Sequence, residues 1–167
     1  MRTVTLDTNT VDFRQLVDVA RAAGFELVHT TVTDREIEGS NVRPASLEAA
    51  RIKEPFVLGE TPWSVGVLGS DSESRAFENL LQIISNGSFP PIGRRDSLSS
   101  GQQRQLRDAM ILMAHIREGR DVLVTNDIKG FIADGRRERI EKESGTKIMT
   151  AEEFLNYCDS RRGGHAV

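Results

Sequence analysis

The chain has little of what builds disulfide-rich, zinc-binding or membrane proteins. Cys158 is the single cysteine among 167 residues, so an intramolecular disulfide is excluded and a thiolate zinc site has too few ligands. No apolar run is long enough to span a bilayer, and the first residues lack the basic-then-apolar pattern of a signal peptide. We therefore expect a cytoplasmic protein without a membrane partner.

Histidine and proline are also sparse. His29, His115 and His165 lie far apart without metal-ligand spacing, which favours ordinary buried or surface side chains. With 38% hydrophobic and 28% charged residues and no Gly or Pro enrichment, the composition is typical of a globular protein. The length supports a single domain over residues 1–167.

Strand-like and helix-like segments alternate along much of the chain. Short apolar or β-branched runs predict strands at residues 3–7, 25–32, 121–125 and 146–150. Helical periodicity predicts helices at residues 11–23, from near Thr33, at 73–86, at 102–118 and from 151. The first of these helices has Phe13, Leu16, Val17 and Ala20 on one face. This alternation predicts an α/β fold, a three-layer α/β/α arrangement around a central parallel sheet.

Residues 40–100 are less regular than the rest and enlarge the predicted fold. Apart from the helix at 73–86, the segment EPFVLGETPWSVGVLGSDS fits short strands, an extended loop or a small flap. The following segment, NGSFPPIGRRDSLSSG, is rich enough in Gly, Pro and Ser to form a loop. We treat residues 40–100 as an insertion.

Four acidic residues fall at informative positions. Asp7 and Asp127 end predicted strands, Glu36 follows another strand in the first helical turn, and Asp108 lies in the helix that leads to the strand at 121–125. Ligands of an open parallel sheet bind beyond the carboxyl ends of its strands, so all four side chains can converge there. Carboxylate oxygens suit Mg²⁺ or Mn²⁺, which activate water for attack on a phosphodiester.

Each acid also has a structural explanation. Asp7 is a candidate helix cap, and Thr33-x-x-Glu36 has the form of a capping box. Asp108 fits a solvated charge on its helix, and Asp127 fits a turn cap. The metal-site hypothesis requires that these explanations do not account for all four residues.

The net charge of -3 conceals clusters of basic residues. These clusters are Arg94–Arg95, Arg104–Arg107, Arg136–Arg137–Arg139 and Arg161–Arg162. An acidic centre with a basic rim favours a single nucleic-acid strand held by its phosphates, and we expect Arg136 and Arg137 to bind substrate.

The order of these motifs resembles the PIN-domain ribonucleases, including VapC-type toxins of toxin–antitoxin pairs. The resemblance rests on LDTN near the start, VTND followed by Phe131 near the end, and the acids between them, and it covers residues 1–39 and 105–155. It implies cleavage of RNA with Mg²⁺ or Mn²⁺ held by Asp7, Glu36, Asp108 and Asp127. It also implies support from Asn9, Thr125 and Asn126, and a homodimer or an antitoxin as partner. The acid motif reads REIEG, so Glu38 competes with Glu36.

Two other functions fit parts of this pattern. A haloacid dehalogenase-like phosphatase also uses Mg²⁺ and an Asp after the first strand, but its signature is Asp-x-Asp and position 9 here is Asn. The other alternative is a non-catalytic scaffold, which would have the same sheet and bind RNA or protein without cleaving a substrate.

Overall fold

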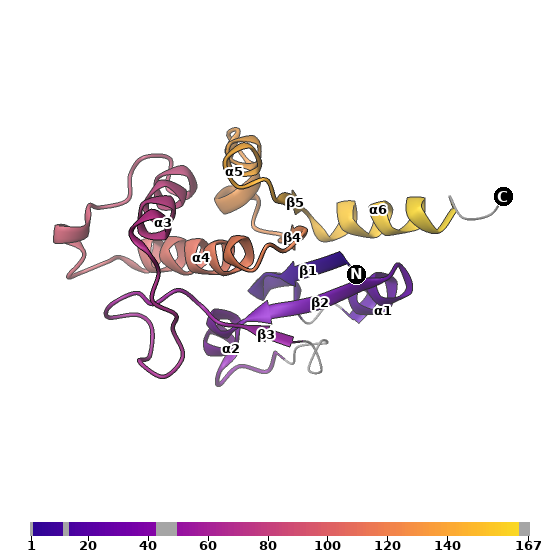
Figure 1. Cartoon of the computed structure of the whole chain (residues 1–167), viewed down its shortest axis with the longest axis horizontal. Coiled ribbons are helices and arrows are strands. Elements are labelled where there is room, and N and C mark those ends of the chain that lie inside the picture. Colours follow the sequence, from indigo (N-terminus) through magenta and orange to yellow (C-terminus); the bar gives the residue numbers. More distant parts are fainter. Residues whose placement is uncertain (1, 12–13, 43–49, 164–167) are drawn as a thin grey trace.

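The computed structural model describes residues 2–11, 14–42 and 50–163, built around a five-stranded parallel sheet (Figure 1). The strands are β1 (Arg2–Leu6), β2 (Phe25–Thr30), β3 (Ala50–Ile52), β4 (Val122–Val124) and β5 (Lys147–Met149). Their order in the sheet is β3-β2-β1-β4-β5, so the first strand of the chain is the central one. All carboxyl ends therefore lie at the same edge of the sheet.

Helices connect the strands and cover the sheet. They are α1 (Arg14–Ala22), α2 (Thr31–Ile37), α3 (Asp71–Ile84), α4 (Ser100–Arg117), α5 (Arg136–Ser144) and α6 (Ala151–Gly163), with 3-10 turns at Thr8–Thr10 (η1) and Ile92–Arg94 (η2) and a π-helical turn, η3, at Ile128–Ile132. Right-handed crossover helices are the usual way to join parallel strands.

Two apolar cores lie on opposite faces of the sheet. Val4 and Leu6 of β1 pack in one core with α1 and α6, whereas Leu123 of β4 packs in the other with α3 and α4. Successive side chains of a strand point to opposite faces, so each buried strand serves both cores. This arrangement confirms the predicted three-layer α/β/α fold.

The face towards α4 also contains a buried polar contact. His115 is fully buried, with Nδ1 2.8 Å from Thr5 Oγ1 and Nε2 in contact with Thr146 Oγ1. Burial lowers the pKa of His115 to about 3, so the ring is neutral and its two nitrogens join β1 to the segment before β5. The expectation of an ordinary buried histidine holds for this residue.

Several predicted boundaries shift in the structure. The helix after β2 begins at Thr31 rather than near Thr33, because Thr30 is its N-cap and accepts a hydrogen bond from Thr33 N at 3.3 Å. The Thr33-x-x-Glu36 capping box is therefore wrong, and Glu36 lies in the second turn. The predicted helix at 11–23 is described from Arg14, and the prediction for Phe13 falls outside the described residues.

The insertion at 40–100 joins the fold in two ways. Strand β3 adds a short edge to the sheet beside β2, and α3 packs Leu81 and Ile84 into the same core as α4. Between them, residues 53–69 form a loop closed by one parallel bridge between Pro55 and Val67, so the short strands considered for this segment reduce to that bridge. We call residues 53–69 the inserted loop. In the described part of the chain, no helix is long and apolar enough to cross a membrane.

Candidate functional site

Asp7 follows β1 directly and is held by neutral donors. Its Oδ1 accepts from Thr8 N at 2.8 Å, as the cap of η1, and its Oδ2 accepts from Asn9 Nδ2 at 2.8 Å and Thr125 Oγ1 at 2.7 Å. The side chain is almost fully buried. The pKa of Asp7 is raised to about 6, mainly by burial and also by the negative charges of Glu36 and Asp127, against the lowering effect of its hydrogen bonds.

The three residues expected to support the pocket do lie around Asp7. Asn9 donates to Asp7 and accepts from Asn126 N at 2.8 Å, which ties the end of β1 to the segment after β4. Thr125 donates to Asp7 and accepts from Asp127 N at 3.0 Å. Asn126 Oδ1 accepts from Ala151 N at 3.1 Å. This network fixes the positions of both aspartates.

Asp127 and Asp108 border the same small space. Asp127 caps η3, with Oδ1 accepting from Gly130 N at 2.9 Å. A Cβ atom on Gly130 would lie 2.7 Å from Asp127 Oδ2 and 3.4 Å from Asp108 Oδ2. Only glycine fits without displacing a carboxylate, since real Cβ atoms do not approach other atoms that closely.

Asp108 is buried rather than solvated. It lies on the long helix α4 with 7% of its surface exposed, so its interpretation as a solvated charge is wrong. Burial raises its pKa well above the usual value, and the charges of Asp7, Asp127 and Glu36 add to the effect, while Arg104 opposes it. The four predicted acids therefore act on one another electrostatically although they come from separate elements.

Glu36 and Glu38 occupy different environments. Thr8 Oγ1 donates to Glu36 Oε2, which places the Glu36 carboxylate beside η1 and near Asp7. Glu38 is the C-cap of α2 and is exposed. Of the two glutamates, the structure brings Glu36 to the acidic cluster.

We define the acidic cluster as Asp7, Glu36, Asp108 and Asp127. Among the described residues, none of these carboxylates forms an ion pair with Lys, Arg or His. Within the same described part, no three His, Cys, Asp or Glu side chains are arranged to hold a metal ion. The four acids thus share one region, but their side chains do not form a complete ligand set.

A second group of charges adjoins the acidic cluster, and we call it the paired cluster. It joins two arginines to two glutamates, Arg35, Arg107, Glu54 and Glu60. Arg35 contacts Glu54 Oε1 at 2.9 Å and Glu60 Oε1 at 3.2 Å, and Arg107 contacts Glu60 Oε1 at 2.7 Å. The hydrogen bond to Glu60 raises the pKa of Arg107, and the charge of Glu36 adds to this.

The sequence indicated only part of this paired cluster. Arg107 belongs to a basic cluster that the sequence shows, whereas Arg35, Glu54 and Glu60 were missed. The available signal was Glu54 and Glu60, two acids inside an apolar insertion, because such residues are seldom buried without a partner.

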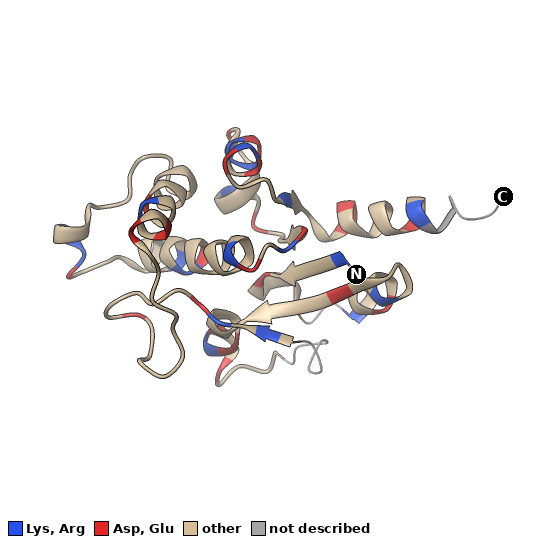
Figure 2. Ribbon diagram, viewed as in Figure 1, with Lys and Arg blue, Asp and Glu red and all other residues tan. Residues whose placement is uncertain are grey.

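Arg136 and Arg137, expected to bind substrate, are engaged within the protein. Arg136 donates to Ile84 O at 3.1 Å and to Asp134 Oδ2 at 2.9 Å, and Arg137 donates to Glu153 Oε1 at 2.9 Å. Figure 2 shows acidic and basic positions mixed along α5, where both arginines lie. The geometry gives them structural contacts, and Arg104 and Arg107 are the basic residues that act on the acidic cluster.

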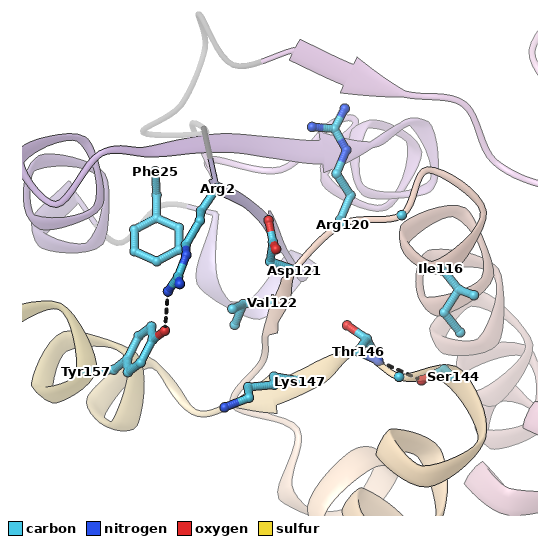
Figure 3. Close-up of a pocket in the computed structure, with 12 residues that line it drawn as sticks. Arg2, Phe25, Ile116, Arg120, Asp121, Val122, Ser144, Thr146, Lys147 and Tyr157 are labelled. Carbon is cyan, nitrogen blue, oxygen red and sulfur yellow. Dashed lines mark hydrogen bonds between the residues drawn. The ribbon is translucent and has the colours of Figure 1, made fainter. Parts of the chain in front are cut away.

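A cavity of about 440 Å³ lies at the opposite edge of the sheet (Figure 3). Its lining includes Arg2, Arg120, Lys147 and Tyr157, at or near the amino ends of β1, β4 and β5 and on α6. Arg2 Nη1 donates to Tyr157 OH at 2.7 Å across this cavity. The amino edge of the sheet therefore has a basic lining, whereas the acidic cluster lies at the carboxyl edge.

No protein-family model matches the sequence, and no curated protein matches it. The resemblance to PIN-domain ribonucleases therefore rests on the quoted residues alone.

Proposed function

We propose that the chain is a ribonuclease that uses Mg²⁺ or Mn²⁺, acts in the cytoplasm and cleaves single-stranded RNA. The observation that carries this proposal is the acidic cluster itself, four carboxylates gathered at the carboxyl edge of the sheet without an ion-pair partner in the described residues. Asp7 and Asp108 are buried without a compensating ion pair, which is costly, and a divalent cation would relieve that cost.

The donor atoms suit such an ion. Asp7, Glu36, Asp108 and Asp127 offer only carboxylate oxygens, which Mg²⁺ and Mn²⁺ prefer, and the side chains would adjust their positions on binding. When bound, the ion would lower the pKa of a coordinated water and neutralise charge on the phosphodiester. The protein itself would orient Asp7 through Thr125 and Asn9, and Arg104 would place a positive charge beside Asp108.

The test compares two changes of aspartate to asparagine. With Mn²⁺ present, wild type should cleave a labelled single-stranded RNA, and Asp7→Asn should lose on the order of 100-fold or more in rate, because metal catalysis supplies several kcal/mol. The control is Asp18→Asn, an exposed position on α1 that should stay close to wild type. Binding of Mn²⁺, measured by calorimetry, should fall in parallel in Asp7→Asn alone.

Two results would overturn the proposal. Hydrolysis of a small phosphomonoester without RNA cleavage would favour the phosphatase alternative, although Asn9 here donates to Asp7 instead of supplying a second acid. Absence of both activities and of Mn²⁺ binding would favour a non-catalytic scaffold.

The proposal extends to partners through the same resemblance. A homodimer or an antitoxin would require an apolar surface, and exposed Leu58, Trp63, Leu68 and Ile92 provide candidates in the insertion. Light scattering of the purified chain would test self-association, with a species of 18.5 kDa alone contradicting a dimer.

A further inference from the structure

One carboxylate oxygen of the inserted loop lies between two guanidinium groups. Glu60 Oε1 is 3.2 Å from Arg35 Nη1 and 2.7 Å from Arg107 Nε. The Glu60 side chain is 15% exposed and that of Arg107 34%, so the contact lies near the surface. Two guanidinium groups converging on one oxygen also suit an oxygen of a phosphate group.

The two arginines are sequence neighbours of acids in the acidic cluster, and the charge of Glu36 acts on Arg107. Arg35 precedes Glu36 on α2, and Arg107 precedes Asp108 on α4. The helices α2 and α4 contact each other, so the two guanidinium groups come from neighbouring elements of the same region. A phosphate held by Arg35 and Arg107 would belong to the same strand as a phosphodiester at the acidic cluster.

The inserted loop is anchored at its ends and attached more weakly at Glu60. At the ends, Phe56 N donates to Val67 O at 2.8 Å and Val67 N donates to Glu54 O at 3.0 Å. Glu54 is fully buried and paired with Arg35. The side chain of Glu60 pairs with the partly exposed Arg35 and Arg107, contacts that water and salt can weaken, and Arg35 Nη1 also donates to the backbone oxygen of Glu60 at 3.2 Å. The carboxylate of Glu60 can therefore turn away from the arginines while the backbone of the loop remains in place.

The inserted loop also presents an aromatic ring. Trp63 is the only tryptophan in the sequence, it is 81% exposed, and its ring lies 4.7 Å from that of Phe56. A tryptophan this exposed is uncommon in a folded protein. Bases of single-stranded nucleic acids stack on aromatic side chains of this kind.

We propose that Arg35 and Arg107 form a phosphate-binding site for single-stranded RNA, which Glu60 occupies in the free protein, and that Trp63 stacks on a base of the same strand. The paired guanidinium groups of α2 and α4 suit the phosphate of a nucleotide, and the exposed ring of the inserted loop suits its base. The inference rests on the proposed function, since it takes RNA as the substrate.

Binding without cleavage tests this site. Fluorescence anisotropy of a labelled 12-residue oligouridylate in EDTA would compare wild type, Glu60→Gln and Glu26→Gln. Glu26 pairs with Arg120 at 3.3 Å and lies on β2, so its variant changes the net charge equally at another Glu–Arg pair. Glu60→Gln should bind about fivefold more tightly with a steeper salt dependence, and Glu26→Gln less than about twofold more tightly.

Two further variants test the arginine and the ring. Arg107→Gln should weaken binding about fivefold, and Trp63→Leu about tenfold, because stacking contributes strongly for each base. Leu58→Ala, at a side chain that is also 81% exposed, is the matched control and should bind as wild type does. In the wild-type protein, the fluorescence of Trp63 should be quenched as oligouridylate is added.

The outcomes separate this inference from the proposed chemistry. Equal affinities of Glu60→Gln and Glu26→Gln, or an unchanged signal from Trp63, would overturn the inference even if the protein cleaves RNA. The expected changes in affinity without Mn²⁺-dependent cleavage would support the binding site and contradict the nuclease. Circular dichroism melting of each variant checks folding, and if Glu60→Gln is unfolded, Arg107→Gln and Trp63→Leu decide the result.

Discussion

The acidic cluster and the paired cluster are neighbours, but only the paired cluster gives its buried carboxylate a positively charged partner. Asp7 and Glu54 are both almost entirely buried, at 2% and 0% exposure. Glu54 contacts a guanidinium group of Arg35, whereas Asp7 accepts only from neutral donors and its pKa is raised to about 6. Burial is therefore no guide to role. Glu54 has its counter-charge within the chain, whereas Asp7 has none among the described residues, and this difference underlies the proposed cation site.

Breaking the paired cluster should have the largest effect on stability. Arg35→Ala leaves Glu54 buried without its partner, which should lower the free energy of unfolding by about 3 kcal/mol. The control is Arg51→Ala, which removes an ion pair to Asp34 at 2.8 Å from a side chain that is 52% exposed and should cost less than about 1 kcal/mol. Urea denaturation measures both, and equal losses would contradict the contrast.

Adding a methyl group beside the acidic cluster should have an intermediate effect on stability. Gly130→Ala places a Cβ atom 2.7 Å from Asp127 Oδ2, which should cost about 2 kcal/mol and weaken Mn²⁺ binding. Gly93→Ala is the control, because a Cβ there has no atom within 4 Å. Thermal melting and Mn²⁺ calorimetry provide the readouts. If Gly130→Ala matches Gly93→Ala in both, the close approach of Gly130 to the carboxylates has no role.

Replacing Asp108 with Asn removes a buried charge and its repulsion of the other carboxylates. This change should have the smallest effect on stability, and it should stabilise the protein. The folded-state pKa of Asp108 is raised, so the wild-type protein loses stability as the pH rises through that value, and Asp108→Asn avoids the loss. Without divalent ions at pH 8, this variant should be more stable by on the order of 1 kcal/mol. The advantage should disappear below pH 3.8, the ordinary value, where both states of the wild type are protonated.

With divalent metal ions present, wild type should become more stable than Asp108→Asn. Ion binding stabilises the folded state, so excess Mn²⁺ should raise the melting temperature of wild type more than that of Asp108→Asn. Asp18→Asn should respond to Mn²⁺ as wild type does. A gain from Mn²⁺ that is equal in all three proteins would show that Asp108 does not contribute to ion binding.

The elements that carry Asp7 and Asp127 could be predicted, because apolar strands alternate there with periodic helices. Strand β3 could not, since only Ile52 of its three residues is buried. Helix α5 has a single buried side chain, Ile140, so its sequence shows no apolar face, and its arginines could be interpreted as a substrate surface.

In the candidate site, too, some contacts could be predicted from the sequence and others could not. The network of Asn9, Thr125 and Asn126 follows from short motifs at two strand ends, and the structure brings these residues together. The contacts of Glu60 with Arg35 and Arg107 span 25 and 47 residues. Ion pairs over such separations leave no periodic signal in a sequence, because they depend on how an irregular loop returns to two helices.

The central position of β1 also determines when the site can assemble. Asp7 and Thr125 are separated by 118 residues, and β1 pairs with β4 as well as with β2. Contacts between distant residues form late in folding, and a chain emerging from the ribosome gains its N-terminal elements first. A partly synthesised chain can pair β1 with β2, but it holds Asp7 without Thr125, Asp108 or Asp127. Any activity of this site therefore has to wait until most of the polypeptide has been made.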